Sequence, residues 1–208
     1  MWIIKLGGSL LGSAELTFWL ERIARHGDGK VVIVPGGGIF ADAVREAQKK
    51  TGMDDRVAHQ LAVMAMDQYG VLLAGLHNAL VIARSELEIA ERSWQHRAIV
   101  WLPSQMVCAE ESIPASWEIT SDSLAAWLAN KLNAEHLLLV KSLEQTSREV
   151  ALGDLVAQDV VDSRLGDYIS RASFKSWVIG KQHYAVLENG LSLPALQQSA
   201  SAITVANI

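Results

Sequence analysis

Residues 3–10 read IIKLGGSL, and residues 31–38 read VVIVPGGG. Each stretch is an apolar strand pattern that ends in a glycine-rich turn. Because glycine has no Cβ atom, such a turn lets backbone N–H groups approach an anion closely. A helix that begins just beyond the turn adds the positive end of its dipole. Two such turns on consecutive strands indicate two anions that face each other, as the donor phosphates and the acceptor of a kinase do.

The rest of the chain alternates between strand and helix patterns. Apolar runs predict strands at residues 2–6, 30–34, 80–83, 97–102, 136–141, 175–179 and 202–206. Helical spacing of apolar residues predicts helices at 15–26, 39–50, 54–69 and 70–79. This order is typical of an α/β fold, a three-layer αβα sandwich with a mainly parallel central sheet. Both glycine turns should lie at the carboxyl-terminal edge of that sheet. Residues 103–119 are expected to form a loop near the site, and 143–160 show no clear pattern.

The composition fits one domain that spans residues 1–208. Half of the 208 residues are apolar, which is enough for one substantial core. The formal charge is −5, and no basic cluster is longer than the pair Lys49-Lys50, which argues against a nucleic-acid partner. Cys108 is the single cysteine, so a reducing compartment such as the cytoplasm is expected. The apolar region 57–83 contains polar residues such as Asp67, so it indicates a buried helix pair and no membrane partner.

A third informative segment, residues 119–128, reads ITSDSLAAWL. Thr120 or Ser121 can cap the helix that follows, and Asp122 falls in its first turn. An acidic residue there favours the helix dipole, so Asp122 has a purely structural interpretation beside a functional one. Two phosphate-type turns in the same chain favour the functional interpretation.

Taken in order, the segments 3–9, 35–38 and 120–125 resemble the amino acid kinase family, which includes acetylglutamate, aspartate, uridylate and isopentenyl phosphate kinases. The resemblance runs from residue 1 to about residue 142. It implies ATP with Mg²⁺ held largely by the ATP phosphates and no metal ligands from the protein. It implies that Lys5 stabilises the transferring phosphoryl group and that Asp122 orients Lys5. The implied binding residues are Gly7, Gly8 and Ser9 for the ATP phosphates and Gly36, Gly37 and Gly38 for the acceptor.

The chain also departs from the family pattern. Many members carry a second catalytic lysine in a late Gly-Gly-Met-x-x-Lys stretch, which is missing here. Lys141 follows a strand where relatives place nucleotide-binding residues, so it is assigned to the nucleotide. Lys175 and Lys181 are later candidates, and the second catalytic position stays open. Residues 1–142 are interpreted as the acceptor and phosphate-binding part, and 143–208 as a reduced nucleotide-binding part.

Within the family, segments 54–60, 66–69 and 117–123 are similar to the small methanofuran-biosynthesis kinases. The implied acceptor is [5-(aminomethyl)furan-3-yl]methyl phosphate, which is converted to its diphosphate. Arg56 and His59 lie three residues apart and share a helix face, so they could contact the acceptor phosphate. Asp67 could meet the amine. The structural alternatives are a solvated arginine and a histidine satisfied inside the fold.

Two other functions remain open at this stage. One is a different small-molecule phosphate kinase, such as an isopentenyl phosphate kinase. Its usual histidine just after the glycine turn is absent, since Ile39 and Phe40 follow Gly38. The other is a non-catalytic binding or storage protein on the same fold. In each case the apolar helical region 57–83 predicts a homodimer or higher homo-oligomer.

Overall fold

The computed structural model describes residues 1–142 and 147–205. All the described strands belong to one eight-stranded sheet with the order β3-β4-β2-β1-β5-β7-β8-β6. Its neighbouring strands are parallel except for the antiparallel pair β7–β8. The strands are β1 (Trp2–Leu6), β2 (Val31–Pro35), β3 (Leu80–Ala83), β4 (Ala98–Trp101), β5 (His136–Lys141), β6 (Glu149–Ala151), β7 (Lys175–Gly180) and β8 (Ser201–Thr204).

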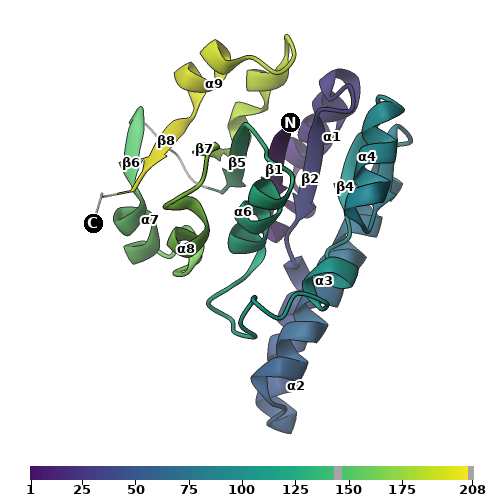
Figure 1. Ribbon diagram of the computed structural model, residues 1–208, viewed down its shortest axis with the longest axis vertical. Coiled ribbons are helices and arrows are strands. Elements are labelled where there is room, and N and C mark those ends of the chain that lie inside the picture. Colours follow the sequence, from purple (N-terminus) through teal and green to yellow (C-terminus); the bar gives the residue numbers. More distant parts are fainter. Residues whose placement is uncertain (143–146, 206–208) are drawn as a thin grey trace.

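Helices cover both faces of this sheet and make the three-layer sandwich that the sequence predicts (Figure 1). The α-helices are α1 (Ala14–His26), α2 (Gly38–Thr51), α3 (Asp55–Leu76), α4 (Glu86–Trp94), α5 (Ser104–Val107), α6 (Ser121–Lys131), α7 (Leu152–Ala157), α8 (Leu165–Ile169) and α9 (Leu193–Ser199). Two 3₁₀ helices, η1 (Gly8–Leu10) and η2 (Lys181–Leu187), complete the described elements. One core packs α6, α7 and α8 against the sheet, and the other packs α1, η2 and α9 against the opposite face.

The alternation of side chains along β1 decides where its lysine lies. Ile4 and Leu6 belong to the core beneath α1, whereas Ile3 belongs to the core beneath α6. Successive side chains of a strand point to opposite faces, so Lys5 lies on the α6 side with Ile3. Trp2–Leu6 is paired on both sides, with β2 and β5, which places this strand in the middle of the sheet.

The helical region after residue 54 is one helix, not the pair that the sequence predicts. The predicted boundary coincides with Gly70, a residue of low helix propensity. Here the glycine serves close packing, because a Cβ atom at this position would lie 2.5 Å from Leu102 Cδ2. α2 and α3 pack against each other and extend together beyond the sheet (Figure 1). Among the described residues no helix is long and apolar enough to cross a membrane.

Two further differences concern the ends of the sheet. The segment without a clear pattern contains β6, a three-residue strand with an exposed edge. Its pattern is weak because only the middle residue, Val150, is partly buried. The predicted strand at 202–206 is observed as Ser201–Thr204, and residue 206 lies outside the described residues. The segment 103–119 contains the short helix α5 and is otherwise turns and irregular backbone.

The two glycine turns lie at the same edge of the sheet, as predicted, and touch each other. A Cβ atom on Gly8 would lie 2.3 Å from both Cα and N of Gly38, and one on Gly36 would lie 2.5 Å from the Gly8 nitrogen. Gly38 also has a positive φ of 54°, which glycine adopts at little cost. The approach of the two turns therefore depends on the absence of side chains.

Candidate active site

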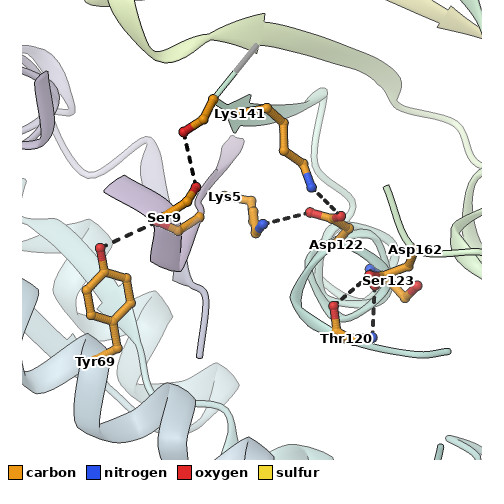
Figure 2. Close-up of polar contacts among 10 residues, drawn as sticks. Lys5, Ser9, Tyr69, Thr120, Asp122, Ser123, Lys141 and Asp162 are labelled. Atoms are coloured by element: carbon orange, nitrogen blue, oxygen red, sulfur yellow. Dashed lines mark hydrogen bonds and ion pairs between the residues drawn. The ribbon is translucent and has the colours of Figure 1, made fainter. Parts of the chain in front are cut away.

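A buried carboxylate links two lysines at this edge of the sheet. Lys5 Nζ lies 2.9 Å from Asp122 Oδ1, and Lys141 Nζ lies 2.5 Å from Asp122 Oδ2. Lys5 comes from β1, Lys141 from the end of the neighbouring strand β5, and Asp122 from the first turn of α6 (Figure 2). All three side chains are largely or fully buried. The structure thus gives Asp122 two ionic partners, where the sequence assigned it one.

The charges of this triad hold one another in place. Burial by itself raises the pKa of Asp122, but the positive charges of Lys5 and Lys141 outweigh burial and lower it to about 2. Burial and the neighbouring Lys5 lower the pKa of Lys141, while Asp122 opposes them. Asp122 is therefore ionised at neutral pH and is a very weak base. Its chemistry is electrostatic, because it carries a fixed negative charge between two ammonium groups.

The helix that carries Asp122 is capped by a residue from much later in the chain. Asp162 accepts hydrogen bonds from the Thr120 and Ser123 backbone nitrogens, at 2.8 and 2.9 Å. It also accepts one from the Thr120 hydroxyl at 2.6 Å (Figure 2). Thr120 occupies the N-cap position as predicted, but its own hydroxyl makes no capping bond. Burial and the charge of Asp122 raise the pKa of Asp162, and these hydrogen bonds oppose the rise.

A cavity of about 480 Å³ opens beside the two glycine turns. Gly8, Ser9 and the second turn form one end, and the surface of α3 around His59 forms a wall. Trp117 closes another side, where its indole nitrogen donates to Gln48 Oε1 at 2.7 Å. It brings the second turn and His59, which the sequence analysis assigned to the acceptor, together with Gly8 and Ser9, which it assigned to the ATP phosphates; we call it the acceptor cavity.

A second cavity, of about 420 Å³, contains the triad. Lys5, Asp122 and Lys141 line it together with Val156 of α7 and residues 159–163, which follow that helix. Three residues, Arg45, Trp117 and Thr120, line both cavities, so the two spaces adjoin. Ligands in the two cavities would therefore meet beside these three residues, and the lysines lie within the second cavity.

The first glycine turn is braced from both sides. Tyr69 of α3 donates its hydroxyl to the Gly7 carbonyl at 3.5 Å, and burial raises the pKa of Tyr69 to about 12. The Ser9 hydroxyl lies 3.2 Å from that of Ser142, just beyond β5 (Figure 2). The turn is thus fixed to the same strand end that carries Lys141.

The other residues predicted for the site divide into two groups. His59 lines the acceptor cavity, where burial lowers its pKa and a bond to the Ser116 backbone opposes that shift. Arg56 is exposed in the first turn of α3 and lines neither cavity. Asp67 is not in the acceptor cavity either, because its carboxylate accepts hydrogen bonds from the backbone nitrogen and hydroxyl of Ser104. Helical spacing alone did not tell which side of α3 faces the turns.

The later lysines do not approach Asp122. Lys175 begins β7 at the opposite edge of the sheet and is exposed. Lys181 lies 3.6 Å from Glu15 of α1, on the other face. Of the three lysines considered after residue 140, Lys141 is the one that shares a carboxylate with Lys5.

Three site residues escaped the sequence analysis. Asp42 and Arg45 line the acceptor cavity and follow Gly38 by four and seven residues, which is the spacing of one helix face. That spacing was a usable signal. Asp162 offered no local signal, because its partners lie 39 and 42 residues earlier in the chain.

No group of three or more histidine, cysteine, aspartate or glutamate residues suited to a metal ion occurs within residues 1–142 and 147–205.

The chain belongs to the amino acid kinase family, whose model matches residues 1–145. It is 27% identical over 198 residues to [5-(aminomethyl)furan-3-yl]methyl phosphate kinase of Methanocaldococcus jannaschii, a match that covers 88% of this chain and 89% of the relative. The protein is accordingly a phosphotransferase of the kinase type.

Solved structures with the same fold include two nucleotide kinases. Uridylate kinase from Archaeoglobus fulgidus superimposes with a TM-score of 0.70 at 18% identity, over 98% of this chain and 99% of that one. UMP kinase from Bacillus anthracis gives a TM-score of 0.69 at 17% identity, over 98% and 95%. These likenesses establish the fold of nearly the whole chain.

The triad generates a prediction about acid stability. Asp122→Asn leaves two buried ammonium groups without their counter-ion, so it should lower the free energy of unfolding by about 3 kcal/mol at neutral pH. The native pKa of Asp122, about 2, lies below the ordinary value of 3.8. The stabilisation that ionised Asp122 provides is therefore complete above pH 3.8 and is lost as the pH falls toward about 2.

Urea unfolding of both proteins between neutral pH and about pH 2 measures this difference. The gap in the free energy of unfolding between wild type and Asp122→Asn should narrow as the pH falls. Asp154→Asn, at an exposed carboxylate on α7, is the matched control and should show a small gap throughout. A gap for Asp122→Asn that stays constant below pH 4 would contradict the ionic role of this residue.

Proposed function

We propose that this kinase transfers the γ-phosphoryl group of ATP to the phosphate of a small acceptor, and that the acceptor is [5-(aminomethyl)furan-3-yl]methyl phosphate. The observation that carries the proposal is that the cavity containing the Lys5–Asp122–Lys141 triad adjoins the cavity beside the two glycine turns. The acceptor would occupy the cavity beside Gly36, Gly37 and Gly38. The ATP phosphates would lie against Gly7, Gly8 and Ser9, with Mg²⁺ that arrives on the nucleotide.

The lysines provide the charge that the reaction needs. An oxygen of the acceptor phosphate attacks the γ-phosphorus, the bond from that phosphorus to the bridging oxygen breaks, and ADP leaves. Negative charge develops on the transferring group and on the leaving oxygen, so positioned cations do most of the catalytic work. Lys5 and Lys141 supply these cations from two adjacent strands. Lys141 thereby binds the nucleotide through its phosphates, and Asp122 keeps both ammonium groups charged and oriented.

A phosphate acceptor also fits the weak basicity of Asp122, the carboxylate between the two lysines. An alcohol acceptor would need a base to remove its proton, and a carboxylate with a pKa of about 2 is poorly suited to that task. A phosphate monoester is mostly a dianion at neutral pH, because its second pKa is about 6. It already presents a nucleophilic oxygen without a proton.

The acceptor itself is supported by the furan phosphate kinase of Methanocaldococcus jannaschii, which aligns with most of this chain. The alternative is another small phosphate acceptor of the family, such as isopentenyl phosphate. Polar groups in the acceptor cavity, among them Asp42 and Arg45, favour a polar acceptor over a prenyl tail. A non-catalytic storage role is disfavoured, because the lysine-rich triad is complete.

The catalytic roles predict a defined kinetic pattern. Lys5→Ala and Lys141→Ala should each lower kcat by about 10²–10³, because each removes charge that is needed chiefly in the transition state. Steady-state kinetics with varied ATP would separate the effects on kcat and KM. Lys175→Ala, at the exposed opposite edge, is the control and should react like wild type. A Lys141→Ala variant with normal kcat and a raised KM for ATP would restrict Lys141 to nucleotide binding.

An acceptor panel tests the substrate. ATP consumption should be measured with the furan monophosphate, its unphosphorylated alcohol, isopentenyl phosphate, UMP and acetylglutamate. The furan monophosphate should give the highest kcat/KM and yield a diphosphate and ADP. Preference for the alcohol or for acetylglutamate would overturn the assignment of a phosphate acceptor. Preference for isopentenyl phosphate would keep the mechanism and change the substrate.

Assembly into at least a homodimer is a further part of the proposal. Several large apolar side chains of α3 are exposed in the isolated chain, among them Met64, Val71 and Leu76. Their burial between two copies would stabilise a symmetric pair. Light scattering at micromolar concentration should give about twice the mass of one chain or more. A monomer at that concentration would argue against pairing through α3.

A further inference from the structure

The helix after the second glycine turn carries an ion pair into the acceptor cavity. Asp42 and Arg45 lie on the same face of α2 as Gly38, and both line the cavity. Arg45 Nη1 donates to Asp42 Oδ1 at 3.0 Å, and the Arg45 guanidinium lies 4.4 Å from the centre of the Trp117 ring. The wall of the cavity therefore holds Arg45 from two sides.

The charges that line this cavity are few and opposite in sign. Among the described lining residues, Asp42 is the single carboxylate and Arg45 the single lysine or arginine. Burial lowers the pKa of His59, the third ionisable group, so its ring is mostly uncharged at neutral pH. A ligand with one anionic and one cationic group matches this wall, because each charge finds its complement.

Each partner of the ion pair has a free side toward such a ligand. Arg45 also lines the second cavity, which contains the lysines, so it lies between the acceptor cavity and the triad. Asp42 uses Oδ1 for Arg45, and its Oδ2 has no protein partner within the described residues. The Asp42 side chain is 70% exposed, so a ligand can reach that oxygen.

We propose that Asp42 selects acceptors that carry an ammonium group, by accepting a hydrogen bond from that group at Oδ2 while Arg45 holds the phosphate end. This inference rests on the proposed function, since the aminomethyl group of the furan monophosphate is the cation concerned. The carboxylate also repels acceptors with an anionic tail, so it acts against wrong substrates as well as for the right one. The role belongs to Asp42 rather than Asp67, whose carboxylate is engaged by Ser104.

The test compares two acceptors, the furan monophosphate and an analogue in which a methyl group replaces the aminomethyl group. Wild type should prefer the amine by about 10–10² in kcat/KM, the range expected for a hydrogen bond to a charged group. Asp42→Asn should reduce this ratio to within about threefold of unity, mainly through KM, because the contact exists in the ground state as well as the transition state. Asp42→Glu keeps the charge and should keep a preference for the amine.

Glu46→Gln is the matched control. Glu46 lies on the same helix, pairs with Lys50 at 3.1 Å and lines neither cavity. The substitution Glu46→Gln removes the same charge at an exposed position, so the variant should keep the wild-type preference for the amine. An equal loss of preference in Glu46→Gln would reduce the effect to general electrostatics and overturn the proposal.

Other outcomes separate this inference from the proposed function. Equal use of both phosphates by wild type would overturn the role of Asp42 and leave the kinase proposal standing. A parallel loss of activity on both acceptors in Asp42→Asn would show that Asp42 acts only by holding Arg45. If wild type phosphorylates neither compound, the proposed acceptor fails, and the role of Asp42 fails with it. Circular dichroism of each variant would confirm that it is folded.

Discussion

The attraction between one buried carboxylate and two buried ammonium groups is the constraint on which the rest of the site depends. A lysine removed from water loses much of its hydration, and two lysines in close proximity repel each other. Asp122 compensates for both effects, because each of its oxygens faces one ammonium group. The triad as a whole retains one positive charge. The fold therefore keeps, in a mostly buried place, the charge that a transferring phosphoryl group requires.

The parallel sheet brings these groups together from distant parts of the chain. β1 and β5 are neighbours with their carboxyl ends at one edge, and side-chain alternation sends both lysines toward α6. The glycine turns leave the same edge and touch through atoms that no side chain separates. The proposed donor and acceptor sites thus lie at strand ends, while α2 and α3 supply the outer walls of the acceptor cavity. The triad and the walls of the acceptor cavity therefore come from different elements of the fold.

Local patterns account for much of this arrangement. The apolar runs and glycine turns were sufficient to predict most of the sheet and the shared edge of the two turns, whereas the pairing of Lys5 with Asp122 was implied by the family resemblance. It was harder to predict which face of a helix lines the site, because the spacing of Arg56 and His59 does not tell which side of α3 faces the glycine turns. The boundary predicted at Gly70 was wrong because packing against Leu102, rather than helix propensity, explains that glycine. The role of Asp162 could not be predicted, because a capping residue that lies far away in the sequence gives no local signal near the helix that it caps.

That distant cap joins the start of α6 to a later part of the chain. The first turn of α6 belongs to the segment shared across the family match, whereas its hydrogen-bond acceptor lies beyond that segment, at residue 162. During synthesis, the start of α6 leaves the ribosome well before its acceptor does. The triad therefore reaches its final geometry only once the later residues have folded back. An engineered hybrid that exchanges the later part of this chain for that of another kinase must bring a carboxylate to the same place, or the first turn of α6 will lack the cap that Asp162 provides.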